Sequence, residues 1–340
     1  MTHKNSKMMK IAYCIYAVNH VVTDYYIDII KEGMKKSGYN VKVVSSLNDI
    51  KDRSAPIIVS SAVQQLKLYL RGFRNFITWS QGAVPEESYM RNHSWLRWKI
   101  ISMIDRFTFS RCKLLFVVSE YQKEFYEKKY RLDLSNNCYV MPCYNCEIEE
   151  TCFKPADKYK NNIFVFAGSC KSVWQYFDET LLFYKKIEDK YGDKVFFRLL
   201  TPDIEYAKEK IKNVGIRYYD IDCVKPSELP RKLSSCKFGL LLRENNVVNN
   251  VATPTKLSTY MSCGLIPIVS DSIKDFAKSM KNRDYFVIVN SDNNITEVEK
   301  YIEKDINNNE VLEEFYKYWA DHYNTQVHID NISKLINQLL

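Results

Sequence analysis

The residue types best suited to chemistry gather in one stretch of this 340-residue chain, residues 238–271, which reads FGLLLRENNVVNNVATPTKLSTYMSCGLIPIVSD. A buried strand is predicted to end at Arg243, and Pro254 stands where a helix would begin, with Thr253 as its N-cap. Backbone N–H groups at a helix start attract phosphate, and Lys256 and Arg243 would add full positive charges. The stretch therefore predicts a phosphate-binding site.

The common phosphate- and cofactor-binding motifs are absent from the sequence. Only nine glycines occur, and no two lie closer than Gly33 and Gly38. Neither G-x-G-x-x-G nor G-x-x-x-x-G-K-[ST] is present, and G-x-S-x-G and H-E-x-x-H are missing as well. The usual evidence for dinucleotide-binding enzymes, P-loop enzymes, serine hydrolases and zinc proteases is thus lacking.

The elements that must position the site alternate in type. Short apolar runs are followed by amphipathic runs of helical length, which is the pattern of βαβ units. The predicted fold class is α/β, with two doubly wound domains that bind ligand in the cleft between them, where strands end. The expected ranges are 1–150 for the N-terminal domain, 151–308 for the C-terminal domain and 309–340 for helices packing back toward the N-terminal domain. The expected elements include a strand at 216–219 and a helix at 254–263.

The net charge of +8 is uneven, because residues 64–114 hold nine Lys and Arg residues and only three acidic ones. Aromatic side chains such as Trp95 and Trp98 are interleaved with the cations, which suits an anionic bilayer surface. The alternative is an ordinary solvated amphipathic helix near 95–111. No nucleic-acid module accompanies the segment, so no nucleic-acid partner is predicted. With ten cysteines and no apolar run of about 18 residues, the chain is expected in the cytoplasm.

Three segments carry a resemblance to a known family. The pattern P-x-K-x-x-E-Y-[ML]-x-x-G-x-P-[VI] is matched by Pro254, Lys256, Tyr260, Met261, Gly264, Pro267 and Ile268. Residues 164–175 (FVFAGSCKSVWQ) and 78–89 (TWSQGAVPEESY) are similar to G-S-x-x-x-W-Q and W-x-Q-G-x-x-P-E-E segments. The chain thereby resembles GT-B fold glycosyltransferases of the retaining family-4 type, in particular bacterial members.

That resemblance implies two Rossmann-like domains facing across a cleft, the N-terminal one for the acceptor and the C-terminal one for a nucleotide diphosphate sugar. Transfer would occur with retention and without metal or cofactor, to a glycan or lipid-linked glycan in surface-polysaccharide synthesis at the inner membrane face. The implied residues are Arg243, Lys256 and Glu244 for catalysis; Gly168, Ser169, Lys171, Thr201, Thr255 and Thr259 for the donor; and His20, Gln81 and Gly82 for the acceptor.

The cations would compensate the charge that grows on the leaving diphosphate. The alternatives are a surface lysine for Lys256 and a structural interdomain ion pair for Arg243. Glu244 would bind sugar hydroxyls or pair with a neighbouring cation. The motifs leave open which nucleotide, sugar, acceptor and linkage are used.

The sequence departs from the family at its E-x(7)-E pair, whose second glutamate contacts the donor ribose. Val251 and Thr259 occupy these two positions. Ribose contacts would then be weaker or come from Glu244, and the alternative is a catalytically inactive homologue acting as a binding or scaffold subunit. An epimerase or phosphorylase with the same architecture is a second alternative.

Two patterns permit a metal site without requiring one. Asp220 and Asp222 form a D-x-D, a motif that holds a divalent cation in GT-A enzymes. The alternative interpretation is that these residues belong to a strand-end loop near the nucleotide base. Cys143 and Cys146 form one C-x-x-C, but no second pair or histidine accompanies it. We expect no metal.

Overall fold

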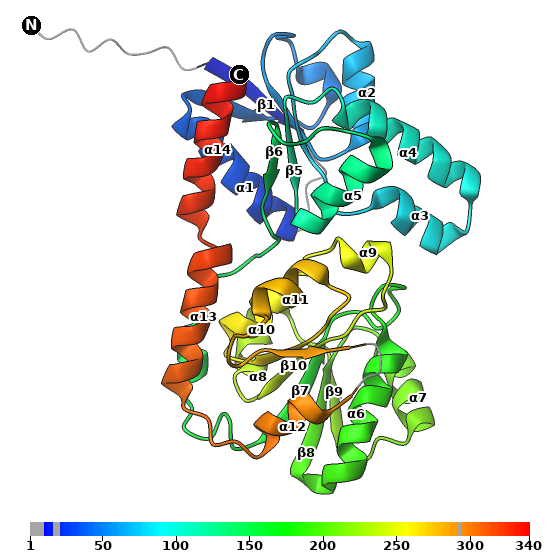
Figure 1. The fold of residues 1–340 in the computed structure, drawn as a ribbon, viewed down its shortest axis with the longest axis vertical. Helices are drawn as coiled ribbons and strands as arrows, with labels where there is room; N and C mark the ends of the chain where they lie inside the picture. The colour runs from blue at the N-terminus through cyan, green and yellow to red at the C-terminus, as the bar shows by residue number, and fades with distance from the viewer. Residues whose placement is uncertain (1–9, 16–20, 291–293) are drawn as a thin grey trace, which may run out of the picture. The chain divides into compact units, whose positions relative to one another are not determined.

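The computed structural model describes residues 10–15, 21–290 and 294–340. They form two compact units, each with a six-stranded parallel sheet (Figure 1). Unit 1 comprises Met1–Cys143 and Asn324–Leu340, and unit 2 comprises Tyr144–Tyr323. The division falls before the expected boundary at residue 150, since Tyr144 already stacks on Tyr323 within unit 2, with ring centroids 5.0 Å apart.

Unit 1 has the strand order β2-β1-β3-β4-β5-β6. Its strands are β1 (Lys10–Ile15), β2 (Tyr39–Val43), β3 (Ile57–Val59), β4 (Phe76–Trp79), β5 (Leu114–Val117) and β6 (Cys138–Val140). Its helices are α1 (Val21–Lys36), η1 (Leu47–Asp49), α2 (Ala62–Leu70), α3 (Val84–Asn92), α4 (Trp95–Phe109), α5 (Glu120–Tyr130) and α14 (Thr325–Leu339). Serine N-caps start α2, α4 and α5, because the hydroxyls of Ser61, Ser94 and Ser119 accept hydrogen bonds from backbone N–H groups of the first turn.

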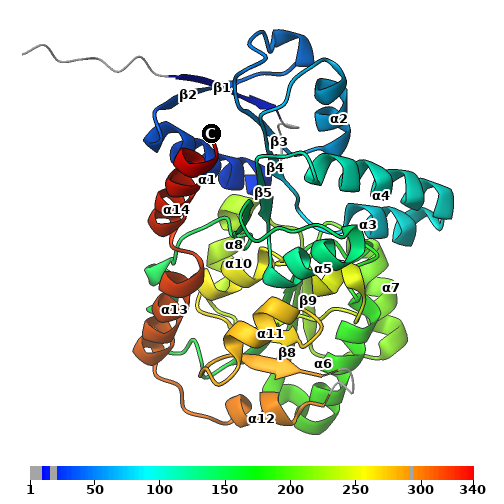
Figure 2. The same cartoon turned by 45° about the horizontal axis from the view of Figure 1, so that its top comes forward.

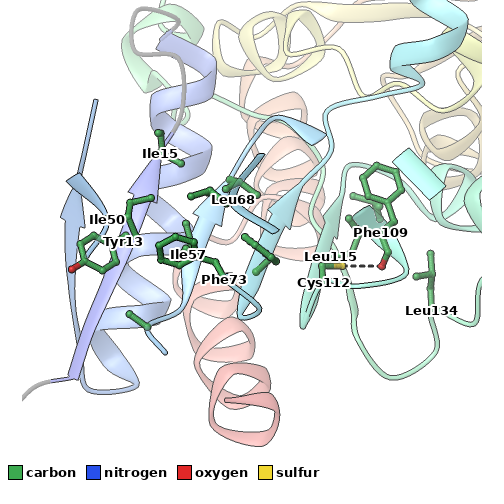
Figure 3. Packing of buried hydrophobic residues seen from close by; sticks show 14 of the residues in the cluster. Tyr13, Ile15, Ile50, Ile57, Leu68, Phe73, Phe109, Cys112, Leu115 and Leu134 are labelled. Carbon is green, nitrogen blue, oxygen red and sulfur yellow. Dashed lines mark hydrogen bonds between the residues drawn. The ribbon is translucent and has the colours of Figure 1, made fainter. Parts of the chain in front are cut away.

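One hydrophobic cluster of the unit 1 core lies between the sheet and the helices α2, α4 and α5. Figure 3 shows Tyr13 of β1, Ile57 of β3 and Leu68 of α2 among the side chains of this cluster. The central strands read as unbroken apolar runs, such as LLFV in β5, because helices cover both faces of a parallel sheet. Burial of the whole strand explains why these elements are predictable from the sequence.

Unit 2 has the order β12-β11-β10-β7-β8-β9, so its strand order reverses between β7 and β10. Its strands are β7 (Asn162–Ala167), β8 (Val195–Leu200), β9 (Tyr219–Asp222), β10 (Phe238–Leu241), β11 (Ile266–Ser270) and β12 (Val287–Val289). Its helices are η2 (Glu150–Phe153), α6 (Phe177–Tyr191), η3 (Gly192–Lys194), α7 (Ile204–Val214), η4 (Pro226–Glu228), α8 (Leu229–Leu233), α9 (Val247–Asn250), α10 (Lys256–Ser262), α11 (Lys274–Met280), α12 (Thr296–Ile302) and α13 (Asn308–His322).

Two expected elements of unit 2 are displaced. The strand predicted at 216–219 begins only at Tyr219, because the backbone N–H groups of Arg217 and Tyr218 donate to the buried carboxylate of Glu188 in α6 instead. The helix predicted at 254–263 begins at Lys256, so Thr253 is not its N-cap.

The two C-terminal helices belong to different units, although both were expected to pack toward the N-terminal domain. Helix α13 stays with unit 2, where Trp319 Nε1 donates to Glu147 Oε2 at 3.0 Å. Helix α14 lies against α1 in unit 1 (Figures 1 and 2). A Cβ atom on Gly33 of α1 would lie 2.4 Å from Ile332 Cγ2, so this close approach requires glycine.

Candidate functional site

A cavity of about 330 Å³ opens in unit 2 at the carboxyl ends of β7, β8 and β9, next to α10; we call it the unit 2 cavity. It lies beside the point where the strand order reverses, which is where ligands bind in such sheets. Five residues predicted to act on the donor line it: Gly168, Thr201, Thr255, Lys256 and Thr259. The fold thus brings together segments that lie far apart in the sequence.

Gly168 allows Lys256 to reach the cavity. Its φ is +130°, a conformation that side-chain-bearing residues rarely adopt. A Cβ atom there would lie 3.0 Å from Lys256 Cε and 3.1 Å from Lys256 Nζ. Any other residue at position 168 would therefore strain the turn and push the lysine aside.

Two cations converge on a single neutral oxygen. Lys256 Nζ and Arg243 Nη1 each donate to Gln175 Oε1 at 2.7 Å, and Arg243 Nη1 also donates to the carbonyl of Trp174 at 2.6 Å. The ammonium group lies 3.9 Å from the ring centroid of Phe166. Within the described ranges, neither cation has a carboxylate within 4.0 Å, so their charges have no anionic partner there.

Burial makes this lack of counter-charge costly. Desolvation, and then the charge of Arg243, hold the pKa of Lys256 well below its usual value. Desolvation lowers the pKa of Arg243 to about 10, and its Nε atom is buried without a hydrogen-bond partner. A bound anion would oppose both shifts, because an opposite charge favours the charged form of each group.

Tyr260 fixes α10 over the sheet. Its ring packs directly on Gly239 of β10, where a Cβ atom would lie 2.4 Å from the ring. Its hydroxyl accepts a hydrogen bond from the backbone N–H of Ala167 at 3.0 Å, at the end of β7. Helix α10 is thereby held to both strands that flank the reversal point, and Lys256 starts that helix.

The carboxylate of Asp203 accepts hydrogen bonds from the predicted donor turn at 169–171. Ser169 Oγ donates to Asp203 Oδ2 at 2.7 Å, and the backbone N–H of Cys170 donates to the same oxygen at 2.8 Å. The hydrogen bond from Ser169 lowers the pKa of Asp203. Lys171 Nζ lies 3.9 Å from Asp203 Oδ1, and neither Ser169 nor Lys171 lines the unit 2 cavity.

Glu244 and the two positions of the missing glutamate pair differ in their surroundings. Glu244 is exposed, accepts from Asn246 Nδ2 at 2.9 Å, and does not line the cavity. Val251 is buried. Thr259 lines the cavity while its hydroxyl donates to the carbonyl of Thr255 at 3.1 Å. The cavity therefore lacks a carboxylate at the position where the family places one.

The predicted acceptor residues belong to unit 1. His20 lies outside the described residues. Gln81 lines a second cavity, of about 450 Å³, which we call the unit 1 cavity, and its Nε2 donates to Thr23 Oγ1 at 3.4 Å. Gly82 does not line the cavity; its carbonyl accepts from the hydroxyl of Tyr126 at 2.7 Å. Tyr126 thus fixes the loop after β4.

The carboxylates of the D-x-D pattern have cationic partners. Asp220 and Asp222 lie within β9 and not in a strand-end loop, which corrects the expected placement. Asp220 pairs with Arg198 at 2.9 Å, and Asp222 pairs with Lys232 at 2.6 Å. The described part of the chain contains no group of three or more His, Cys, Asp or Glu residues arranged to hold a metal ion.

Helix α4 presents apolar side chains to solvent. Trp95 and Leu96 are 60% and 63% exposed, and Ile100 and Met103 are also exposed on this helix. Exposed cations lie beside them, and Lys99 Nζ is 4.8 Å from the ring centroid of Trp95. Helices α3 and α4 run side by side (Figure 2). An ordinary solvated helix would turn a polar face outward. In the described ranges no helix has the length and apolarity needed to span a bilayer.

Sequence reasoning missed two residues that bind predicted site residues: Gln175, which accepts from Lys256 and Arg243, and Asp203, which accepts from Ser169. Gln175 is the last residue of the G-S-x-x-x-W-Q segment, and this motif position could have identified it as a site residue. Asp203 carried no such signal, because only the fold brings α7 next to the turn after β7.

Comparisons with known proteins agree on the fold alone. No family model and no curated protein matches the sequence. Sucrose-phosphate synthase from Thermosynechococcus elongatus has a TM-score of 0.64 at 10% identity, over 97% of this chain and 99% of that one. An α,α-trehalose-phosphate synthase (UDP-forming) from Burkholderia vietnamiensis has a TM-score of 0.62 at 9% identity, over 92% and 77%.

A TarM mutant from S. aureus, in complex with fondaparinux, α-GlcNAc-glycerol and UDP, has a TM-score of 0.63 at 12% identity. The match covers 86% of this chain, which spans 57% of the TarM chain. These neighbours are GT-B glycosyltransferases, so the expected α/β fold with two Rossmann-like domains is confirmed.

Proposed function

We propose that this chain is a retaining glycosyltransferase that binds a uridine diphosphate sugar in the unit 2 cavity and transfers the sugar to a glycan or lipid-linked glycan. The observation that carries the proposal is the cation pair of the half-buried Lys256 and the buried Arg243, which share one amide oxygen and have no carboxylate partner among the described residues. The TarM complex contains UDP and the trehalose-phosphate synthase is UDP-forming, which supports this choice of nucleotide. Surface-polysaccharide synthesis in the cytoplasm is the proposed setting.

The chemistry follows from the charge of the leaving group. When the glycosidic bond to the diphosphate breaks, negative charge grows on the departing phosphate oxygen. Lys256 at the cavity wall and Arg243, bonded to the same amide oxygen, are held in place beforehand and would stabilise that charge more than water does. We propose that these two positive charges take the place of a metal ion in the reaction. Nothing in the cavity or the comparisons favours the inactive alternative.

The test is a calorimetric titration with UDP, and with GDP and ADP for comparison, in the presence of EDTA throughout. We expect saturable UDP binding that EDTA does not change and that Lys256→Met weakens at least about tenfold. Lys278→Met, an exposed lysine of the same unit, is the matched control and should leave binding unchanged. Absence of UDP binding, or equal binding by the Lys256→Met variant, would refute the donor site.

Release of UDP from UDP-sugars, followed over time, separates an enzyme from a binding subunit. We expect slow hydrolysis of one UDP-sugar in the absence of acceptor, and loss of that hydrolysis in Lys256→Met. A chain that binds UDP-sugars tightly but releases no UDP from any of them, with or without glycan acceptors, would be a binding subunit.

We propose further that α4 attaches the enzyme to an anionic membrane surface, where a lipid-linked acceptor would be found. The exposed Trp95, Leu96, Ile100 and Met103 would enter the headgroup region, and the neighbouring cations would contact acidic headgroups. Co-sedimentation with phosphatidylglycerol vesicles should exceed that with phosphatidylcholine vesicles. Leu96→Ser should reduce it severalfold, whereas Leu182→Ser, an exposed leucine of α6, should not. Equal sedimentation of both variants would contradict this attachment site.

A further inference from the structure

The unit 1 cavity has the position of a ligand site. It lies where β3 and β4 end, beside the reversal of strand order between β1 and β3. Its volume of about 450 Å³ falls in the usual range for small-molecule sites. Gln81, which the sequence resemblance assigned to the acceptor, is one of its lining residues.

A buried carboxylate lines this cavity. Asp105 lies on α4 and is only 3% exposed. Its Oδ2 accepts one long hydrogen bond, from the Tyr130 hydroxyl at 3.3 Å. The nearest cation of α5, Lys129, forms its own ion pair with Glu86 at 2.7 Å. Asp105 therefore retains hydrogen-bonding capacity that the protein itself does not use fully.

Two more polar groups of the lining are unsatisfied. Gln64 Oε1 and Trp79 Nε1 are buried and have no hydrogen-bond partner among the described residues. Buried polar atoms normally find partners, so unpaired ones around a cavity indicate a missing ligand or water. Apolar side chains, including Ile104 and Phe109, complete the wall. Hydrogen-bonding groups beside apolar surface match a sugar ring, which carries hydroxyls at its edge and C–H groups on its faces.

The charge of the lining argues against a phosphorylated ligand. None of the described residues that line the unit 1 cavity is Lys or Arg, whereas Lys256 lines the unit 2 cavity. A buried carboxylate would repel phosphate but can accept hydrogen bonds from hydroxyl groups. The ligand chemistry that fits is a neutral, hydroxyl-rich one.

We propose that the unit 1 cavity binds a sugar residue of the acceptor and that Asp105 is the specificity-determining residue that hydrogen-bonds its hydroxyl groups. The identification of this sugar as the acceptor rests on the proposed glycosyltransferase function. Burial raises the pKa of the Asp105 carboxyl to about 7, although the charge of Lys129 and the hydrogen bond from Tyr130 act in the opposite direction, so these partners compensate its burial only in part.

The experiment uses the full chain labelled with 5-fluorotryptophan and follows the Trp79 resonance by fluorine NMR, assigned with Trp79→Phe. Methyl glycosides of glucose, galactose, mannose, N-acetylglucosamine and N-acetylgalactosamine are the probes, and glycerol is the control for nonspecific polyol effects. We expect at least one glycoside to shift the resonance saturably and glycerol to leave it in place. Because only unit 1 is observed, this result is independent of UDP binding in unit 2.

Asp105→Asn should weaken the glycoside about tenfold, because an amide replaces a carboxylate acceptor of similar size. Asp49→Asn removes the same charge from an exposed position of unit 1 and should change nothing. If Asp105→Asn fails to fold, Gln64→Leu serves as the second variant and should also weaken binding. The proposal is overturned if no glycoside shifts Trp79, if glycerol acts equally, or if binding is the same in the folded cavity variant and the wild type.

Discussion

The two units share an architecture and differ in the charge of their cavities. Each cavity lies at the carboxyl ends of parallel strands, beside the point where the strand order reverses. In unit 2 the cavity is lined by a half-buried lysine, with a buried arginine bonded to the same amide oxygen. In unit 1 a buried aspartate lines it, and none of its described lining residues is basic.

In both units the fold places a cavity at the strand ends, and we propose that side-chain charge selects the ligand. A diphosphate needs cations that water does not screen; Lys256 lines the unit 2 cavity, and Arg243 is bonded to the same amide oxygen. A sugar hydroxyl needs a hydrogen-bond acceptor, and the unit 1 cavity offers a carboxylate. The difference between the two sites can therefore be tested by changing single charges.

The largest effect is expected from Lys256→Met. Loss of a cation aimed at the leaving diphosphate should lower the rate of sugar transfer by about 10²- to 10³-fold. The same variant should leave glycoside binding at Trp79 unchanged, because that residue lies in unit 1. The measurement is steady-state release of UDP. A loss below tenfold would show that Lys256 does not stabilise the leaving group.

The pH dependence of stability should have opposite signs in the two units. Asp105 has a raised pKa of about 7, so the folded state keeps a proton that the unfolded state has lost, and its contribution to stability falls by roughly 3 kcal/mol as pH rises from about 4 to 7. Lys256 has a lowered pKa, so its penalty on the folded state fades as pH rises through that pKa toward about 10.4.

Thermal midpoints of the wild type, Asp105→Asn and Lys256→Met, measured from acid to alkaline pH, check both signs. Lys129, Glu86 and Tyr130 lie around Asp105 and remain in every variant, so differences between variants isolate the changed group. A wild-type advantage over Asp105→Asn that grows as pH rises from 4 to 7 would contradict the sign given for unit 1.

A charge added to the unit 2 cavity should remove its preference for anions. Gln175→Glu would supply the missing carboxylate to both cations, so it should raise the thermal midpoint without nucleotide and weaken UDP binding about tenfold, or about 1.4 kcal/mol. Calorimetry and thermal unfolding measure the two effects. Gln338→Glu, at an exposed position of α14, is the control. Tighter UDP binding by Gln175→Glu would refute the assigned role of the cation pair.

The smallest effect is expected from Leu96→Ser on α4. Its side chain is 63% exposed and lines neither cavity, so stability should change by less than about 0.5 kcal/mol. UDP and glycoside binding should stay within twofold of wild type, as judged by the same titrations. A large loss in either titration would mean that α4 supports a cavity and is not solely a surface element.

The strands that the apolar runs predict most directly are those buried along their whole length. Strands β10 and β11 are of this kind, and helices follow the amphipathic stretches. The start of β9 was not predictable, because Glu188, about 30 residues earlier in the chain, binds the backbone just before it. The local hydrophobic pattern predicts which residues are buried, but it does not predict which distant side chain accepts a hydrogen bond from the backbone.

By itself the sequence determined the α/β class, the run of parallel strands, and the segments that supply Gly168, Thr255 and Lys256, because these depend on periodicity and on motifs contained within short stretches. Only the tertiary structure decided that Gln175 lies between two cations and that Asp105, one acidic residue among many in the sequence, is buried at a cavity. The physical reason is desolvation. Whether a charge is screened by water or left without a partner depends on segments that only folding brings together.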